Sequence, residues 1–276
     1  MRIAFCILGR CSKRPNVGGE TAKIFGTRLI LINPRFNGRQ CKIGLDFNGI
    51  VIVLNQTSLL KKQIQTLAGF HSFVLLNFWY TIGKTFLPTL TWRRSEGTKV
   101  VYLTFDDGPH PDITRWVIQE LDKVGAKGSF FVVGENAQTH PDVLSELEKN
   151  GHSIGNHTYH HLKGWGISTA AYMHDIDQCN DVIHEKRLFR PPFGRINFGA
   201  IKPLSTEYEI VMWDVLTKDY LKGLNTKKAQ KRIQKATKSG SIVVFHDSIK
   251  ANPNLKVLLP DYLQFLAKEG YEMRAL

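Results

Sequence analysis

The sequence predicts an α/β fold built on a mainly parallel sheet with helices packed outside it. From Lys99 onward, strand-forming runs alternate with helical runs, and short connections join them. The predicted strands are apolar throughout instead of alternating apolar and polar residues, which is typical of a sheet covered on both faces. These observations leave open whether the sheet closes into a barrel or stays open.

The predicted elements follow one another in a regular order. Helix 112–124 places five apolar side chains on one face, and Gly125 ends it. Helix 141–150 ends at Gly151, and a third helix is predicted at 226–238. The predicted strands are 99–105, 129–133, 152–156, 187–190, 209–215, 241–245 and 271–275.

Residues 1–85 lack this alternation, which predicts an irregular, basic N-terminal extension before an α/β domain at 86–276. The extension is expected to be poorly ordered, a small accessory region, or a translated upstream stretch. Of the formal net charge of +13, residues 1–80 carry +9, from eleven Lys and Arg against Glu20 and Asp46. Such charge favours anionic envelope polymers, lipid headgroups or nucleic acid without choosing among them. No nucleic-acid-binding motif accompanies it, so we expect no nucleic-acid partner.

The cysteines and the apolar runs indicate neither a disulfide framework nor a membrane span. The four cysteines form no CxxC pair, so free thiols are expected. The apolar run at the N-terminus is too short for a secretory signal. Residues 66–80 are the most apolar stretch, but His71 and Asn77 interrupt it, and about 20 residues are needed to span a bilayer. A buried helix is expected there, with contact to a membrane or envelope surface as the alternative. The sequence predicts no oligomeric state.

Ionisable residues follow five of the predicted strands directly. In a parallel α/β barrel, the carboxyl ends of the strands meet at one rim, where active sites are built. Core packing alone does not explain charged groups at five strand ends. These residues are Asp106, Asp107, His157, His161, Arg190, Asp219 and His246.

Two histidines and two carboxylates among them suggest a metal site. The pair His157 and His161, four residues apart, can turn both rings toward one ion, although such pairs also arise by chance. A lone DDG, as at 106–108, is more often a turn than a catalytic site. Together they supply two imidazoles, a carboxylate ligand and a spare carboxylate, and a His₂Asp site leaves a position open for water. His160 is expected to be a solvated neighbour. The remaining histidines expected at the surface or at helix ends are His110, His140, His152 and His174.

Residues 99–276 resemble the polysaccharide deacetylase family, the NodB-homology group of carbohydrate esterases (family 4). The matching motifs are TFDDG at 104–108, HTYHH at 157–161, RPPFG at 190–194, WDVLTKDY at 213–220 and VFH at 244–246. The resemblance implies a distorted (β/α) barrel of about seven parallel strands. It also implies a hydrolase that removes N-acetyl groups from sugars with a divalent metal, most often Zn²⁺, with Co²⁺ as the other candidate.

The resemblance also implies roles for individual residues. Asp107, His157 and His161 would hold the metal. Asp106 would be the general base, kept ionised by the adjacent cation and Arg190. His246 would be the general acid that protonates the leaving amine, with Asp219 fixing its tautomer. The residues expected to contact substrate are Phe193, whose backbone N–H would serve as an oxyanion donor, and Tyr220, Val244 and Trp213.

The chain departs from the family pattern at several positions, which puts substrate preference in doubt more than activity. Leu216 stands at the first acidic position of the fourth motif, and Tyr220 stands at its aromatic position. Leu162 replaces a proline after the second metal histidine, and Val244 replaces a leucine. The expected substrate is peptidoglycan or a chitin-like oligosaccharide, which makes the cell envelope a plausible location. The alternatives are an esterase or amidase for another acyl substrate, and a non-catalytic glycan-binding module.

Overall fold

The computed structural model describes residues 35–36, 39–40, 42–45, 51–54, 87–94, 97–184 and 187–276. The chain divides into two compact units, Met1–Phe78 and Trp79–Leu276. In the first unit, β1 (Arg35–Phe36) pairs with β2 (Arg39–Gln40), and β3 (Lys42–Leu45) pairs with β4 (Val51–Leu54), both antiparallel. The predicted helix at 66–80 and three of the cysteines lie outside the described residues. The expected poor order of residues 1–85 stays a prediction.

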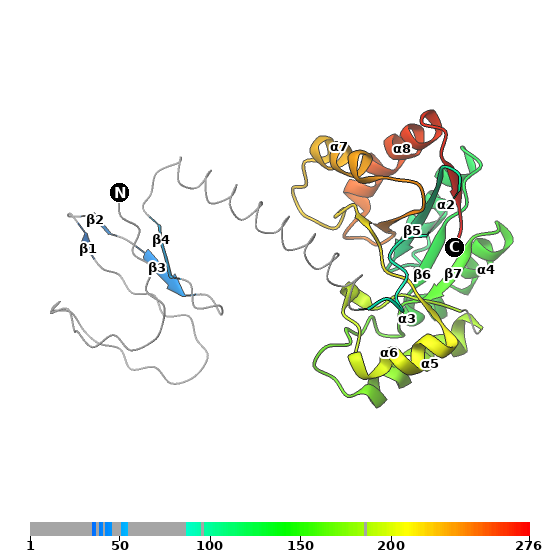
Figure 1. Ribbon diagram of the computed structural model, residues 1–276, viewed down its shortest axis with the longest axis horizontal. Helices are drawn as coiled ribbons and strands as arrows, with labels where there is room; N and C mark the ends of the chain where they lie inside the picture. Colours follow the sequence, from blue (N-terminus) through cyan, green and yellow to red (C-terminus); the bar gives the residue numbers. More distant parts are fainter. Residues whose placement is uncertain are drawn as a thin grey trace. The chain divides into compact units, whose positions relative to one another are not determined.

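The second unit is built on a curved parallel sheet surrounded by helices, as Figure 1 shows. Seven strands follow the order β10-β11-β5-β6-β7-β8-β9, and β12 also pairs with β5. All these pairings are parallel. The predicted barrel of about seven parallel strands is therefore confirmed. The strands are β5 (Val100–Asp106), β6 (Ser129–Val132), β7 (Ser153–Asn156), β8 (Leu188–Phe189), β9 (Glu209–Ile210), β10 (Val215–Leu216), β11 (Ser241–His246) and β12 (Glu272–Arg274).

Helices separate most of these strands along the chain. The three predicted helices are present as α2 (Ile113–Asp122), α4 (Pro141–Lys149) and α7 (Thr226–Ala236). The others are α3 (Gly134–Thr139), α5 (Thr169–Ile183), α6 (Phe198–Glu207), α8 (Asn252–Lys268) and the short 3₁₀ helix η1 (Pro192–Gly194). No helix in the described part of the chain is long and apolar enough to cross a membrane.

The central strand β5 is buried along its whole length, so both faces of the sheet are covered. On its outer face, Phe105 stacks on Phe130 at 4.9 Å and on Phe245 at 5.9 Å between ring centroids. These rings belong to an apolar cluster that also contains buried residues of α2 and α8. The helices are thus fixed to the outer face by a continuous apolar layer.

The inner face of β5 leads from the core to the rim of the barrel. Val100 and Tyr102 join a second cluster of sheet residues, which includes Ile242 of β11. Because successive side chains of a strand alternate between its faces, Thr104 and Asp106 continue the same inner face. The alternation brings the Asp106 carboxylate to the mouth of the barrel.

The predicted strand 209–215 is wrong as one element. Its first residues form β9, which pairs with β8, and its last residue begins β10, which pairs with β11 at the opposite end of the sheet order. Between them, the Asp214 carboxylate accepts the N–H of Ile242 at 2.8 Å and the hydroxyl of Ser241 at 2.8 Å. The chain therefore changes strand partners within a few residues, and a side chain replaces one backbone acceptor.

The expectation for His152 is also wrong, because this residue is buried. Only 6% of it is exposed, its Nδ1 accepts the N–H of Gly128 at 3.1 Å, and its ring lies edge-on to Phe130. Burial, followed by the charge of Lys127, lowers the pKa of His152 to about 4. It is a neutral core residue.

Candidate active site

The strand ends bring the predicted site residues to one rim. In the register of β5 and β11, Asp106 lies beside His246. Asn156, immediately before His157, ends β7 and pairs with Phe189 of β8, immediately before Arg190. Segments more than a hundred residues apart in the chain thus deliver these groups to the same mouth.

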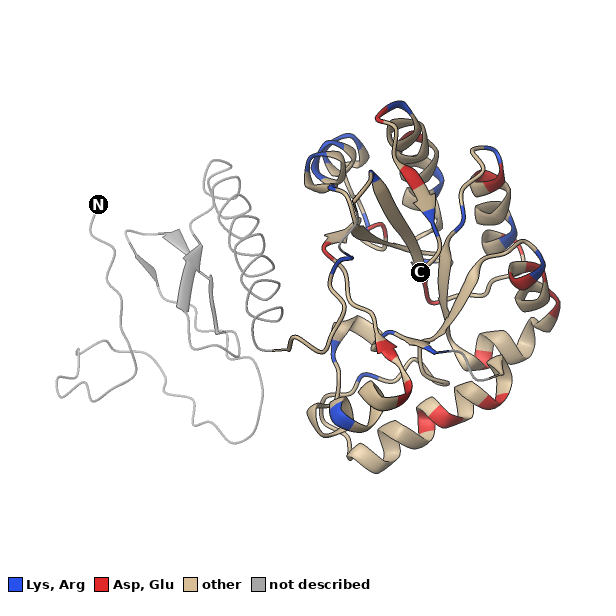
Figure 2. Cartoon of the chain, turned by 45° about the vertical axis from the view of Figure 1, so that its right-hand side comes forward, with Lys and Arg blue, Asp and Glu red and all other residues tan. Residues whose placement is uncertain are grey.

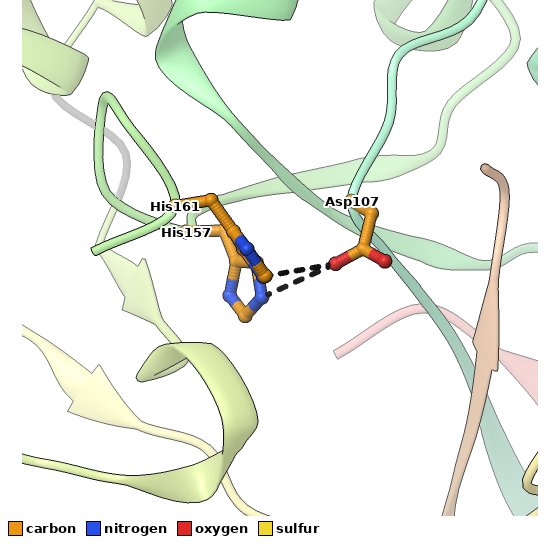
Figure 3. A group of neighbouring side chains, drawn as sticks. All are labelled: Asp107, His157 and His161. Carbon is orange, nitrogen blue, oxygen red and sulfur yellow. Dashed lines mark ion pairs between the residues drawn. The ribbon is translucent and has the colours of Figure 1, made fainter. Parts of the chain in front are cut away.

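Asp107, His157 and His161 form a cluster with the geometry of a metal site (Figure 3). One ligand atom from each lies within 4.8 Å of the others. The Asp107 Oδ1 atom lies 3.1 Å from His161 Nε2 and 3.8 Å from His157 Nε2. Burial raises the pKa of Asp107, but a hydrogen bond from His161 and nearby histidine charges outweigh it and hold the pKa below its ordinary value. The carboxylate is therefore ionised and available to a cation.

His157 is prepared as a neutral ligand. It is 2% exposed, and burial lowers its pKa to about 4. Its Nδ1 lies 2.7 Å from the carbonyl oxygen of Arg190, which can only accept, so the ring proton sits on Nδ1. The Nε2 lone pair is left toward Asp107. A carbonyl that fixes the tautomer of a histidine in this way is a common feature of metal sites.

The two histidines lie on an irregular loop, not on a helix. Thr158 and His161 have positive φ angles of 65° and 55°. Asn156 Oδ1 accepts the N–H of Thr158 at 2.8 Å, and the Thr158 hydroxyl accepts the N–H of Leu162 at 2.8 Å. This conformation turns both rings toward Asp107 without helical periodicity.

Asp175 of α5, which belongs to none of the sequence motifs, holds the middle of this loop. The residue is 4% exposed, and its Oδ2 accepts the N–H groups of Tyr159 and His160 at 3.0 and 3.1 Å. Its Oδ1 lies 2.6 Å from His160 Nδ1. His160 is exposed, as predicted, and its ring is also hydrogen-bonded to Asp175. The only feature of the sequence that could have revealed Asp175 is that it is a single acidic residue on the buried face of a helix.

Arg190 lies fully buried beneath the mouth and pairs with Asp106. Its Nη1 donates to Asp106 Oδ1 and to the Thr104 hydroxyl, each at 2.7 Å. Its other nitrogens donate to the carbonyls of Val211 and Met212. Because Asp106 is 4% exposed, this ion pair is almost sealed from solvent.

His246, which is partly buried, and the fully buried Asp219 form a second pair on the opposite wall. His246 Nδ1 lies 2.7 Å from Asp219 Oδ1, and the backbone N–H of His246 donates to Oδ2 at 2.8 Å. Burial lowers the pKa of His246, but the hydrogen bond and charge of Asp219 outweigh it and raise the pKa to about 9. The imidazole is therefore a reservoir for a proton at neutral pH.

The predicted substrate residues occupy different depths of the mouth. Phe193 is 63% exposed, with a positive φ of 59° and its ring 4.7 Å from that of His161. Within the described residues, no hydrogen bond uses the Phe193 N–H. Trp213 is half-buried near Arg190, and the Tyr220 ring meets His246 edge-on at 5.0 Å. Val244 is only 1% exposed and lies deeper, on the inner face of β11.

Asp247 is a further buried residue for which the sequence predicts no role. Its carboxylate accepts the hydroxyl of Thr114 at 2.5 Å and the N–H of Gly108 at 3.1 Å, and its own N–H donates to the carbonyl of Asp106. Burial raises the pKa of Asp247 to about 7. A Cβ atom at Gly108 would lie 2.1 Å from Asp247 Oδ2, so the DDG segment needs glycine there. Asp247 thus ties this segment to α2.

Sequence relatives of the chain include two bacterial wall enzymes. The chain is 32% identical over 189 residues to a peptidoglycan-N-acetylglucosamine deacetylase of Bacillus cereus, covering 66% of this chain and 88% of that protein. It is 28% identical over 180 residues to the peptidoglycan-N-acetylmuramic acid deacetylase PdaC of Bacillus subtilis, covering 63% of this chain. The match spans only 37% of the length of PdaC.

Structural comparison supports the same relationship. The crystal structure of the Bc1960 peptidoglycan N-acetylglucosamine deacetylase aligns with a TM-score of 0.65 at 25% identity, covering 68% of this chain and 91% of that one. The sequence model of the polysaccharide deacetylase family matches residues 93–206 of the chain. On the fold, the motifs and these relatives, the chain belongs to the polysaccharide deacetylase family.

Proposed function

We propose that the protein is a metal-dependent deacetylase that removes N-acetyl groups from an amino-sugar glycan of the peptidoglycan type. One observation carries the proposal: a His₂Asp cluster, an arginine-paired carboxylate and an aspartate-paired histidine share one rim. The relatives described above act on peptidoglycan by name, which supports this substrate over chitin-like glycans. Such a substrate would place the protein at the cell envelope.

The donor set of Asp107, His157 and His161 fits a divalent ion. One carboxylate, one histidine of fixed tautomer and a second imidazole make a three-ligand site of the kind found in catalytic zinc enzymes. Imidazole and carboxylate donors suit Zn²⁺, with Co²⁺ as the alternative. A bound ion would supply Lewis acidity, which polarises the acetyl carbonyl and makes water more acidic at neutral pH.

Asp106 is the proposed general base. Its paired oxygen faces Arg190, and its position at the mouth leaves the carboxylate able to take a proton from the attacking water. As that proton leaves, the water oxygen forms a bond to the carbonyl carbon of the acetyl group. We propose the N–H of Phe193 as the donor to the oxyanion that develops on the acetyl group, since its ring lies beside that of His161.

His246 is the proposed general acid. Asp219 holds Nδ1, which leaves Nε2 to donate its proton to the sugar nitrogen as the carbon–nitrogen bond breaks. The products are acetate and a free amine. Tyr220 packs against this ring, so we expect it to shape the space for the acetyl methyl group together with Trp213 and Val244.

Acetate release tests the proposal. Purified protein is offered acetylated chito-oligosaccharides, peptidoglycan, xylan and an aryl acetate, with chelator and then with added Zn²⁺ or Co²⁺. Release from the amino-sugar glycans that chelator removes and metal restores is expected. Release from xylan or the aryl acetate alone would favour the esterase alternative, and release from none would favour the non-catalytic glycan-binding module.

Asp106→Asn separates the base from the metal ligands. We expect it to abolish acetate release while about one divalent ion per chain is retained, measured by elemental analysis. Asp112→Asn, a change to an exposed carboxylate on the same segment, serves as the control and should release acetate normally. Loss of the metal in Asp106→Asn would contradict the division of roles between Asp106 and Asp107.

A further inference from the structure

The positive charge of the second unit is concentrated on and around α7. Residues Trp79–Leu276 contain 26 Lys and Arg and 22 Asp and Glu. The stretch 220–246 contains seven of the basic residues and no acid, so the rest of the unit has three more acids than bases. Figure 2 shows blue and no red on α7, whereas α2 and α8 carry both colours. The seven are Lys222, Lys227, Lys228, Lys231, Arg232, Lys235 and Lys238.

Five of these lysines form an exposed surface that we name the α7 lysine face: Lys227, Lys228, Lys231, Lys235 and Lys238. Within the described residues, none of them forms an ion pair. The opposite side of the helix packs on the core through Ala229 and Ile233. Arg232 is used differently, since it donates to the carbonyls of Leu216 and Thr217 at 2.9 and 2.7 Å. The lysines are therefore free for an external partner.

This arrangement opposes the stability of the helix. Lys227, Lys231 and Lys235 are spaced i,i+4, where like charges repel. Lys227 and Lys228 also lie in the first turn, where the helix dipole disfavours positive charge. In α2, by contrast, Arg115 pairs with acids of α4 at 2.5 and 2.8 Å. Solubility alone would be served by mixed charges, so the unpaired lysines indicate a surface kept for binding an anion.

The α7 lysine face is connected to the catalytic mouth by further cations. The loop between β10 and α7 carries Asp219 together with Lys218 and the exposed Lys222. From the β11 side, Lys250 lies 5.4 Å from the centre of the Tyr220 ring, which packs against His246. Positive charge thus extends from the wall that holds His246 to the outer surface of α7.

We infer that the α7 lysine face is a docking surface for the carboxylate-bearing polymer of peptidoglycan, which it holds while an N-acetylated sugar occupies the mouth. This rests on the proposed function. The eleven residues of α7 span about 16 Å at 1.5 Å each, which suits a polymer longer than the sugar being deacetylated. Lysines act as point charges without the bidentate geometry of arginine, which suits carboxylates spread along a flexible chain.

Other polyanions fit this surface less well. A helix that lies on a membrane inserts apolar side chains, but Ala229 and Ile233 of α7 face the core. Sites for single-stranded nucleic acid add aromatic side chains on which bases stack, and α7 has none. A carboxylate polymer needs only the positive charge that the α7 lysine face offers, and so it fits this surface better than a membrane or a nucleic acid does.

The test compares two full-length variants that each lose four lysine charges. The first changes Lys227, Lys228, Lys231 and Lys235 to Gln. The second, a matched control, changes four exposed lysines on other parts of the unit: Lys123, Lys149, Lys202 and Lys268. Glutamine has nearly the helix propensity of lysine, so the change isolates charge. The basic N-terminal segment is the same in both variants.

Co-sedimentation with purified peptidoglycan sacculi measures docking. We expect the α7 variant to bind at least about tenfold more weakly than the unmodified protein, because four exposed ion pairs are lost together. The control should stay within about twofold. Sacculi whose carboxylates are blocked by amide coupling should bind the unmodified protein as weakly as untreated sacculi bind the α7 variant. The α7 variant should also unfold at a higher temperature, since its like-charge repulsion is gone.

Three results would overturn the inference: equal binding by both variants, undiminished binding to carboxylate-blocked sacculi, or tighter binding to phosphatidylglycerol vesicles or DNA than to sacculi. Sedimentation requires no turnover. Absence of acetate release would therefore refute the proposed function and leave the docking result standing. Normal acetate release together with equal binding by the two variants would refute the docking surface and leave the proposed function standing.

Discussion

Asp219→Asn tests how the active site keeps a proton on His246. In the folded protein, the hydrogen bond and charge of Asp219 outweigh burial and raise the pKa of His246 to about 9. An amide in place of the carboxylate keeps the shape and one acceptor but removes the negative charge. The pKa of His246 should then fall toward its ordinary value of about 6.5, or lower because the ring is buried.

The size of the effect follows from these two values. At pH 8, a group with a pKa of about 9 is roughly nine-tenths protonated, whereas one with a pKa of about 6.5 is roughly 3% protonated. Because His246 must donate a proton, the rate falls as pH rises through its pKa. The variant should therefore lose about thirtyfold in acetate release at pH 8 and much less at pH 6. The basic limb of the pH–rate profile should move to lower pH by about 2.5 pH units.

Asp214→Asn is the matched control. Asp214 accepts a backbone N–H and a side-chain hydroxyl from the start of β11, much as Asp219 accepts a backbone N–H and a ring nitrogen at its end. Its loss should destabilise the fold and leave the pH–rate profile in place. If the basic limb stays near pH 9 in Asp219→Asn, or moves equally in Asp214→Asn, the assignment of His246 as the acid held by Asp219 is wrong.

Three further predictions concern two residues that hold the site in place and the first unit of the chain. Asp175→Ala removes the acceptor that holds the metal-ligand loop, so a competing-chelator titration should show metal affinity about 10- to 100-fold weaker, with the exposed Asp181→Ala unchanged. Arg190→Met leaves Asp106 buried without its cation, so urea unfolding should show about 3–5 kcal/mol lost. The double variant with Asp106→Asn should recover part of that loss, and full additivity would contradict a direct pair. Removal of residues 1–78 should leave one cooperative calorimetric transition, and a chain that no longer folds would show that the first unit is required.

The positions of the site residues could be predicted from sequence because they depend on local features. Apolar runs mark the strands, and ionisable residues directly follow several of these runs. A parallel sheet brings the carboxyl ends of its strands to one rim, so these residues meet there whatever the order of the strands. Asp106 and His246 illustrate this, since each ends its strand and the two are register neighbours. The strand pattern predicts Arg190 only for the same rim, and the family resemblance implies its closeness to Asp106.

The supporting residues could not be predicted, because they act across the fold. Asp175 interrupts the apolar pattern of α5 and gains its partners only when the loop at 157–161 packs on that helix. Pro203 within α6 and Pro260 within α8 obscure helical patterns that tertiary packing nonetheless maintains. The partner change within 209–215 depends on where the two ends of the sheet meet.

The bridge between those two ends has a consequence for the strand edges that the sheet exposes. Among the described residues, no ladder joins β9 to β10. Thr91 bridges Val211 beyond β9, and Arg93 bridges Ser241 at the start of β11. Open strand edges are templates for pairing with other chains. A chain trimmed back to Lys99, where the strand–helix alternation begins, would keep every proposed catalytic group and yet expose both edges, so its first failure should be aggregation while the chemistry remains intact.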